Sequence, residues 1–303
     1  MQTRPIGSLN VSIVGLGCNN FGRRADYDAS LKVIDAALDA GINFLDTADI
    51  YGGGESESFI GRALEGRRDQ VIIATKFGHE VAGQGKGASA EYIRIAAEAS
   101  LRRLNTDYID LYQLHTPDPD VPIAETLGAL NDLVQAGKVR EIGCSNFTAE
   151  MLREAESAVM PGAARFVSVQ NHYSMLTRGD EAAVLPECER LNIAYLPYFP
   201  LERGLLTGKF RLGQPIPDGT RLTGNIEFVT DEKLVYVEKL IAFANEHGGH
   251  NILELAFSWL LTRPQIASVI AGAMTHEQVF NNVEAANWQL SAGDLAEIDE
   301  LLA

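Results

Sequence analysis

Four residues that could move a proton stand at or near the ends of apolar runs typical of buried β-strands. They are Asp46 and Tyr51 in INFLDTADIY (42–51), Lys76 in VIIATK (71–76) and His115 in YIDLYQLH (108–115). If these strands are parallel, the four side chains meet at one end of the sheet. A tyrosine, a lysine, an aspartate and a histidine held together are the groups needed to protonate a carbonyl oxygen.

Each of the four residues also has an ordinary structural interpretation. Asp46 could cap the following helix, and Lys76 could extend from a strand end to water. Tyr51 could be a loop aromatic, and His115 could bond the backbone beside Pro117. Their occurrence at the same end of successive predicted strands favours a catalytic set, because four unrelated placements would not share one edge.

The elements that must position these residues alternate along the chain. Apolar or β-branched runs predict strands at 11–17, 43–47, 71–76, 108–114, 141–145, 166–171, 194–199 and 267–271. A 3.6-residue apolar period predicts helices at 31–41, 56–66, 90–104, 124–138 and 149–158. Eight strands joined by helices, with no linker and no shift in composition, predict one (β/α)8 TIM barrel domain over 1–303. The opening RPIGSLNVSI contains a Gly-Ser turn, which predicts a β-hairpin before the first barrel strand.

Two connections are longer than the roughly two to six residues usual in such a barrel. One is the glycine-rich segment 78–90, and the other is the segment 200–230, which is rich in proline and glycine. Both follow predicted strands, so both fall on the C-terminal face, where barrel active sites lie. We therefore expect both loops to contribute to a substrate pocket.

The charge and cysteine content exclude several classes of partner. The chain carries 41 acidic and 25 basic residues, for a formal net charge of −16, which argues against binding nucleic acid or an anionic membrane. Cys18, Cys144 and Cys188 fit no metal-binding spacing, and 1–10 lacks the apolar core of a signal peptide. We expect reduced thiols, no bound metal and a cytoplasmic location.

The sequence disfavours two other interpretations, a doubly wound dinucleotide-binding fold and a metal-dependent barrel enzyme. The segment VSIVGLGCNNFG (11–22) begins like a dinucleotide-binding fingerprint, but the third glycine of that pattern falls on Asn20. A metal-dependent barrel isomerase needs clustered ligands at several strand ends, and only Asp46 and His115 qualify. Activity that survives a chelator would exclude that class.

The strings DTADIYGGGESE (46–57), YIDLYQLHTPD (108–118), GKVREIGCSNF (137–147) and PLERGLLTGKF (200–210) closely resemble the aldo-keto reductases. The resemblance runs from about Gly15 to Asn282. It is strongest to the branch that contains potassium-channel β-subunits and bacterial aldehyde or sugar oxidoreductases. The family is a (β/α)8 barrel that reduces aldehydes and ketones with a nicotinamide dinucleotide, usually the 2′-phosphorylated form, and without a metal.

The resemblance implies a role for each of the four residues. Tyr51 is the expected general acid, Lys76 and Asp46 support it, and His115 orients the carbonyl. A cation beside a phenol stabilises the phenolate, so Lys76 is expected to lower the pKa of Tyr51.

The resemblance also implies which residues bind the cofactor. The expected contacts to the nicotinamide are Ser145, Asn146, Gln170 and the stacking ring of Tyr198. The expected pyrophosphate loop contains Phe199, Pro200, Leu201, Gly204 and Lys209, with Arg221 as a further basic residue. The expected adenosine site contains Gly272, Met274, Gln278, Asn281 and Asn282.

Three residues of the adenosine site depart from the commoner family pattern. Ala271 replaces a proline, Asn281 a glutamate and Met274 a serine, and the last change removes a hydroxyl that could bond the 2′-phosphate. The resemblance implies NADPH/NADP+ as the cofactor. The loss of this hydroxyl predicts only modest discrimination against NADH, which is the alternative.

The expected activity is reduction of a small-molecule carbonyl substrate, or oxidation of a sugar or alcohol in reverse. The expected substrate pocket contains Asn20, Phe21, Phe77 and Phe147. The alternative function is that of a cofactor-loaded regulatory subunit with slow turnover.

Overall fold

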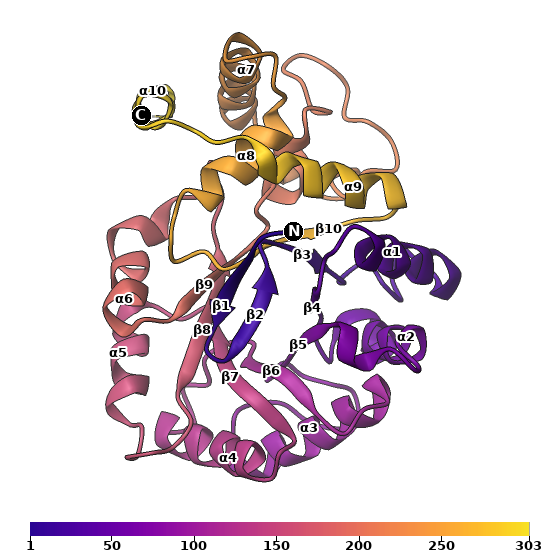
Figure 1. Cartoon of the computed structure of the whole chain (residues 1–303), viewed down its shortest axis with the longest axis vertical. Helices are drawn as coiled ribbons and strands as arrows, with labels where there is room; N and C mark the ends of the chain where they lie inside the picture. The colour runs from indigo at the N-terminus through magenta and orange to yellow at the C-terminus, as the bar shows by residue number, and fades with distance from the viewer. Residues whose placement is uncertain (303) are drawn as a thin grey trace.

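Eight parallel strands form a barrel in the computed structural model, which describes residues 1–302 (Figure 1). The strands are β3 (Val14–Gly17), β4 (Phe44–Asp46), β5 (Ile72–Phe77), β6 (Ile109–Leu114), β7 (Val139–Ser145), β8 (Phe166–His172), β9 (Ala194–Tyr198) and β10 (Val269–Gly272). Their order is β10-β3-β4-β5-β6-β7-β8-β9. The ring closes between β9 and the segment before β10, where the Tyr195 amide donates to the Gln265 carbonyl at 2.7 Å. The predicted (β/α)8 fold is confirmed.

Helices surround the barrel (Figure 1). They are α1 (Tyr27–Asp39), α2 (Glu55–Ala63), α3 (Ala90–Leu104), α4 (Ile123–Gln135), α5 (Ala149–Ser157), α6 (Val184–Leu191), α7 (Asp231–Glu246), α8 (Ile252–Leu261), α9 (His276–Glu284) and α10 (Ala292–Leu301). The five predicted helices correspond to α1–α5. Helix α1 begins earlier than its apolar period indicates, because the Asp26 side chain accepts a bond from the Ala29 amide at 2.9 Å and caps it.

A hairpin precedes the barrel, as predicted, but it uses part of the predicted first strand. The two strands β1 (Thr3–Ile6) and β2 (Leu9–Ser12) are antiparallel, so the run 11–17 is two strands and not one. Ile6, Leu9 and Val11 are fully buried against residues that include Phe44 and Leu111. The run divides because its first part covers the barrel end whereas its second part enters the barrel wall.

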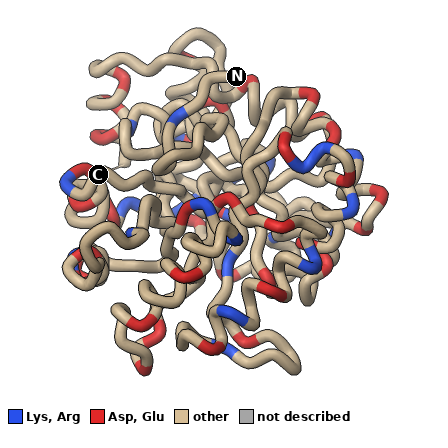
Figure 2. Tube along the Cα trace, turned by 60° about the horizontal axis from the view of Figure 1, so that its bottom comes forward, with Lys and Arg blue, Asp and Glu red and all other residues tan. Residues whose placement is uncertain are grey.

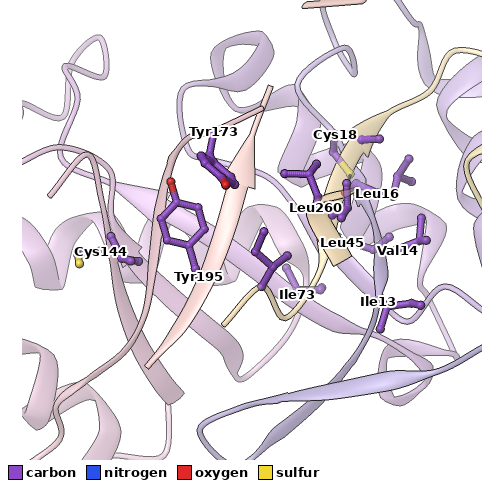
Figure 3. Close-up of a cluster of buried hydrophobic side chains, with 14 of the residues drawn as sticks. Ile13, Val14, Leu16, Cys18, Leu45, Ile73, Cys144, Tyr173, Tyr195 and Leu260 are labelled. Carbon is purple, nitrogen blue, oxygen red and sulfur yellow. Dashed lines mark hydrogen bonds between the residues drawn. The ribbon is translucent and has the colours of Figure 1, made fainter. Parts of the chain in front are cut away.

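Apolar side chains fill the layer between strands and helices. Figure 3 shows Val14 and Leu16 of β3 near Leu45 and Ile73, with Leu260 of α8 beside them. A different set of side chains points into the barrel, because alternate residues of a strand face opposite sides. Two residues beyond the buried Phe44, Ala74 and Leu111 come Asp46, Lys76 and Gln113, so a polar layer replaces the apolar one toward the C-terminal end.

Candidate active site

A cavity of about 740 Å³ opens at the C-terminal ends of the strands, a size typical of ligand sites. Asp46, Tyr51 and His115 line it, whereas Lys76 is completely buried beside them. All of the residues assigned to the cofactor also line it: Ser145, Asn146, Gln170, Tyr198, Phe199, Pro200, Leu201, Gly204, Lys209, Arg221, Gly272, Met274, Gln278, Asn281 and Asn282. The two long loops contribute His79 and several of these residues to the lining of the cavity.

Lys76 and Asp46 form a buried ion pair next to Tyr51. The Lys76 ammonium donates to Asp46 Oδ1 at 2.7 Å and to the Thr47 carbonyl at 2.8 Å. Its Nζ lies 5.3 Å from the centre of the Tyr51 ring. Gln170 Nε2 donates to the other oxygen of Asp46 at 2.8 Å, so both carboxylate oxygens have hydrogen-bond partners.

The pKa values of Lys76 and Tyr51 are both raised above their ordinary values. Burial opposes a charge on Lys76, but Asp46 and Tyr51 outweigh burial, and the pKa of Lys76 is raised. Burial likewise raises the pKa of Tyr51, and Lys76 offsets only part of that rise. Lys76 lowers the pKa of Tyr51 as expected, but the net pKa is raised, because desolvation exceeds the attraction of the ammonium. Tyr51 accordingly keeps its proton at neutral pH.

His115 is a neutral hydrogen-bonding group. Burial, followed by the charge of Lys76 and the neighbouring His79, lowers the pKa of His115 to about 2. Its ring lies edge-on to Tyr51, with 6.0 Å between centres. Its Nδ1 is buried without a partner among residues 1–302, so Nε2 is the nitrogen available to a ligand.

The residues assigned to the nicotinamide are linked to the catalytic set. Asn146 Nδ2 donates to the His115 carbonyl at 2.9 Å, and Asn146 Oδ1 accepts from the Tyr198 hydroxyl at 2.9 Å. Ser145 Oγ donates to the Gln170 carbonyl at 2.6 Å. The amide and hydroxyl groups of these residues therefore already have defined orientations in the cavity.

The turn after Tyr198 fits a chain of phosphates. Phe199, Arg203 and Gly204 have φ of 50°, 57° and 111°, and turns that mix left- and right-handed residues can direct several amides toward one anion. Arg203, Lys209 and Arg221 line the cavity around this turn. This donor set, in a protein whose acidic residues are scattered over the trace (Figure 2), fits the phosphate groups of a dinucleotide.

At the predicted adenosine site, the side chain of Gln278 already has a hydrogen-bond partner within the protein. Gln278 Oε1 accepts a bond from the Met274 amide at 2.8 Å, so this side chain holds its own loop at the start of α9.

Arg24 also lines the cavity, and its guanidinium donates to the Gly219 carbonyl at 2.7 Å. Sequence reasoning missed Arg24, although its place after β3 on the C-terminal face was a usable signal.

The predicted substrate pocket requires a correction. Asn20 lines the cavity, but Phe21, Phe77 and Phe147 are buried in the apolar layer and do not. Phe77 follows the inward-facing Lys76 by one residue, so it faces the helices and packs on Tyr112 with 4.7 Å between ring centres.

Polar residues line the cavity, whereas the three predicted aromatic residues do not. Asn19, Arg24 and His79 line the cavity together with Asn20. His79 lies edge-on to His115, with 4.4 Å between ring centres, so it adjoins the catalytic set.

The model of the aldo/keto reductase family matches residues 13–303. The chain belongs to the aldo/keto reductase family. It is 36% identical to the aldo-keto reductase YhdN of Bacillus subtilis, over 97% of this chain and 91% of that protein. It is 33% identical to the aldo-keto reductase yakc [NADP(+)] of Schizosaccharomyces pombe, over 99% of this chain and 91% of the relative.

A solved structure extends the likeness to three dimensions. The glycerol dehydrogenase AKR11B4 from Gluconobacter oxydans superposes with a TM-score of 0.86 at 30% identity, covering 100% of this chain and 95% of that one. This aldo-keto reductase is thus an NAD(P)H-dependent oxidoreductase. Within residues 1–302, no helix has the length and apolarity needed to span a membrane.

Proposed function

We propose that this chain works as one barrel domain that reduces small aldehydes or ketones with NADPH, or oxidises the matching alcohols in reverse, with Tyr51 as the general acid. The observation that carries the proposal is the position of Tyr51 beside the buried Lys76–Asp46 pair, at a cavity whose other residues fit a dinucleotide. The complete catalytic set favours an active enzyme over a slow-turnover regulatory subunit.

The groups of the protein share the work of carbonyl reduction. Bound nicotinamide supplies a hydride to the carbonyl carbon. Tyr51 and neutral His115 donate hydrogen bonds to the carbonyl oxygen, and these bonds strengthen as negative charge builds there. The Tyr51 hydroxyl then transfers its proton to that oxygen, and the Lys76 ammonium stabilises the phenolate that remains. Asp46 holds Lys76 in position throughout.

Cofactor binding tests the proposal directly. Purified protein should bind NADPH without added metal, and NADPH should be favoured over NADH by roughly ten-fold to a hundred-fold, since one charge-assisted contact contributes about 1.5–3 kcal/mol. Lys209→Met or Arg221→Met should reduce this preference, because one of these cations is expected to meet the 2′-phosphate.

A matched control is Arg211→Gln, which lies in the same loop but pairs with Glu238 outside the cavity. Fluorescence titration of each variant with both cofactors measures the effect. If the wild-type protein binds neither cofactor, the proposed function is wrong; if it prefers NADH, neither cation reaches the 2′-phosphate.

The polar residues at one part of the cavity lining predict the class of substrate. Asn19, Asn20, Arg24 and His79 offer hydrogen bonds that an unsubstituted alkyl chain cannot satisfy. The name of the related glycerol dehydrogenase supports a small hydroxylated substrate. We expect kcat/KM for glyceraldehyde to exceed that for propanal by about ten-fold, the value of one or two hydrogen bonds. Initial rates with the two three-carbon aldehydes test this, and a preference for propanal would contradict it.

A further inference from the structure

A histidine lies against the ring assigned to the nicotinamide. His172 ends β8 and Tyr198 ends β9, and the two residues are register partners. Their rings stack with 5.3 Å between centres and 16° between planes. Tyr198 lines the cavity, and the imidazole ring of His172 packs against the Tyr198 ring.

A buried glutamate holds this histidine. Glu202 is only 3% exposed, and its Oε2 accepts from His172 Nε2 at 3.2 Å, Ser174 Oγ at 2.9 Å and Thr177 Oγ1 at 3.0 Å. Its Oε1 accepts from Lys233 Nζ of α7 at 2.8 Å. Burial opposes the charge, but these donors outweigh it and lower the pKa of Glu202 to about 2.

The backbone around Glu202 needs such support. Phe199, Glu202 and Arg203 adopt left-handed φ of 50°, 46° and 57°. A non-glycine residue in this region is strained, and such conformations persist where surrounding contacts impose them. The Glu202 side chain ties the turn to the end of β8 on one side and to α7 on the other.

We propose that His172, Glu202 and Lys233, here called the Glu202 brace, are positioning residues for the cofactor. The brace sets the plane of the Tyr198 ring through the stacked His172. It also holds the 199–204 turn in the shape that places Arg203 at the cavity with Lys209 and Arg221, where the phosphates are expected. This inference rests on the proposed function, in which Tyr198 stacks on the nicotinamide.

The test compares the brace with a buried carboxylate elsewhere. Glu202→Gln keeps the size of the side chain but loses its charge. The control is Asp110→Asn, because Asp110 is 1% exposed, is paired with Arg68 and Arg140, and does not line the cavity. We expect Glu202→Gln to weaken NADPH binding and to raise its KM about ten-fold, with kcat at saturating cofactor within about three-fold of wild type. Asp110→Asn should lower the melting temperature without changing either constant.

Three further variants test the inference. His172→Phe keeps a flat ring on Tyr198 and should retain most of the affinity that His172→Ala loses. Lys233→Met leaves the other donors to Glu202 in place and should weaken binding by about three-fold, which provides a measurement even if Glu202→Gln does not fold.

Three outcomes overturn the inference. One is wild-type affinity in both Glu202→Gln and Lys233→Met, and another is equal loss in His172→Phe and His172→Ala. The third is failure of the wild-type protein to bind either cofactor, which also overturns the proposed function. Binding by the wild type with unaffected variants would refute the brace alone.

Discussion

Replacing Tyr51 with phenylalanine is expected to slow carbonyl reduction by roughly 10²–10⁴-fold, because the variant keeps the ring but loses the proton donor. NADPH affinity should survive, since the hydroxyl is assigned to the substrate oxygen. Lys76→Met should cause comparable damage by another route. Burial already raises the pKa of Tyr51, and without the ammonium nothing comparable would stabilise the phenolate.

The double variant separates a shared role from two independent ones. If Tyr51 and Lys76 act as a unit, the double variant should be scarcely slower than either single variant. Single-turnover rates with NADPH and a reactive aldehyde measure the chemical step. Near-wild-type hydride transfer by Tyr51→Phe would mean that His115, or another group, donates the proton.

A second large effect is expected from Asp49, which precedes Tyr51 by two residues. Asp49 is 1% exposed, and neither carboxylate oxygen has a hydrogen-bond partner within residues 1–302. Burial and the nearby Glu57 raise its pKa to about 7, although Arg103 and Lys76 oppose this. The folded protein therefore holds a proton on Asp49 over a pH range in which the unfolded chain has released it.

The sign of the effect on stability follows from this difference. The folded pKa lies above the unfolded one, so the stabilisation is complete below about pH 4 and is lost as the pH rises to about 7. The free energy at stake is on the order of 4 kcal/mol at most, from about three pKa units. Asp49→Asn should remove this loss. The variant should match wild type below about pH 4 and be clearly more stable at pH 8.

Denaturant unfolding at several pH values measures the difference. The control is Asp39→Asn, because Asp39 is an exposed aspartate near the end of α1. That substitution should leave the pH dependence unchanged. Parallel stability curves for wild type and Asp49→Asn between pH 5 and 8 would show that the Asp49 proton is not retained on folding.

The fold and most of the candidate site follow from local features of the sequence. The alternation of short apolar runs with 3.6-residue periods determined the barrel, since parallel strands joined by helices leave little other choice of topology. Once the strands are parallel, residues at their carboxyl ends must share one face. The sequence therefore placed Asp46, Tyr51 and His115 at one cavity, with the segment 200–210 beside them.

Other properties depend on side chains that are distant in sequence and on which way each residue faces. A one-residue step reverses the direction of a strand side chain, so Phe77 packs in the apolar layer although Lys76 faces inward. The segment 11–17 divides because the barrel end must be covered, which local periodicity does not report.

Ionisation and bracing were likewise decided only by the tertiary structure. The pKa of Tyr51 depends on how far burial outweighs Lys76, and that balance exists only once the barrel has enclosed both groups. His172 and Lys233 are far apart in the chain, yet both donate to the same carboxylate, that of Glu202. The sequence determined which groups reach the cavity, whereas the folded surroundings determined their charge and orientation, because desolvation and hydrogen bonding act through space.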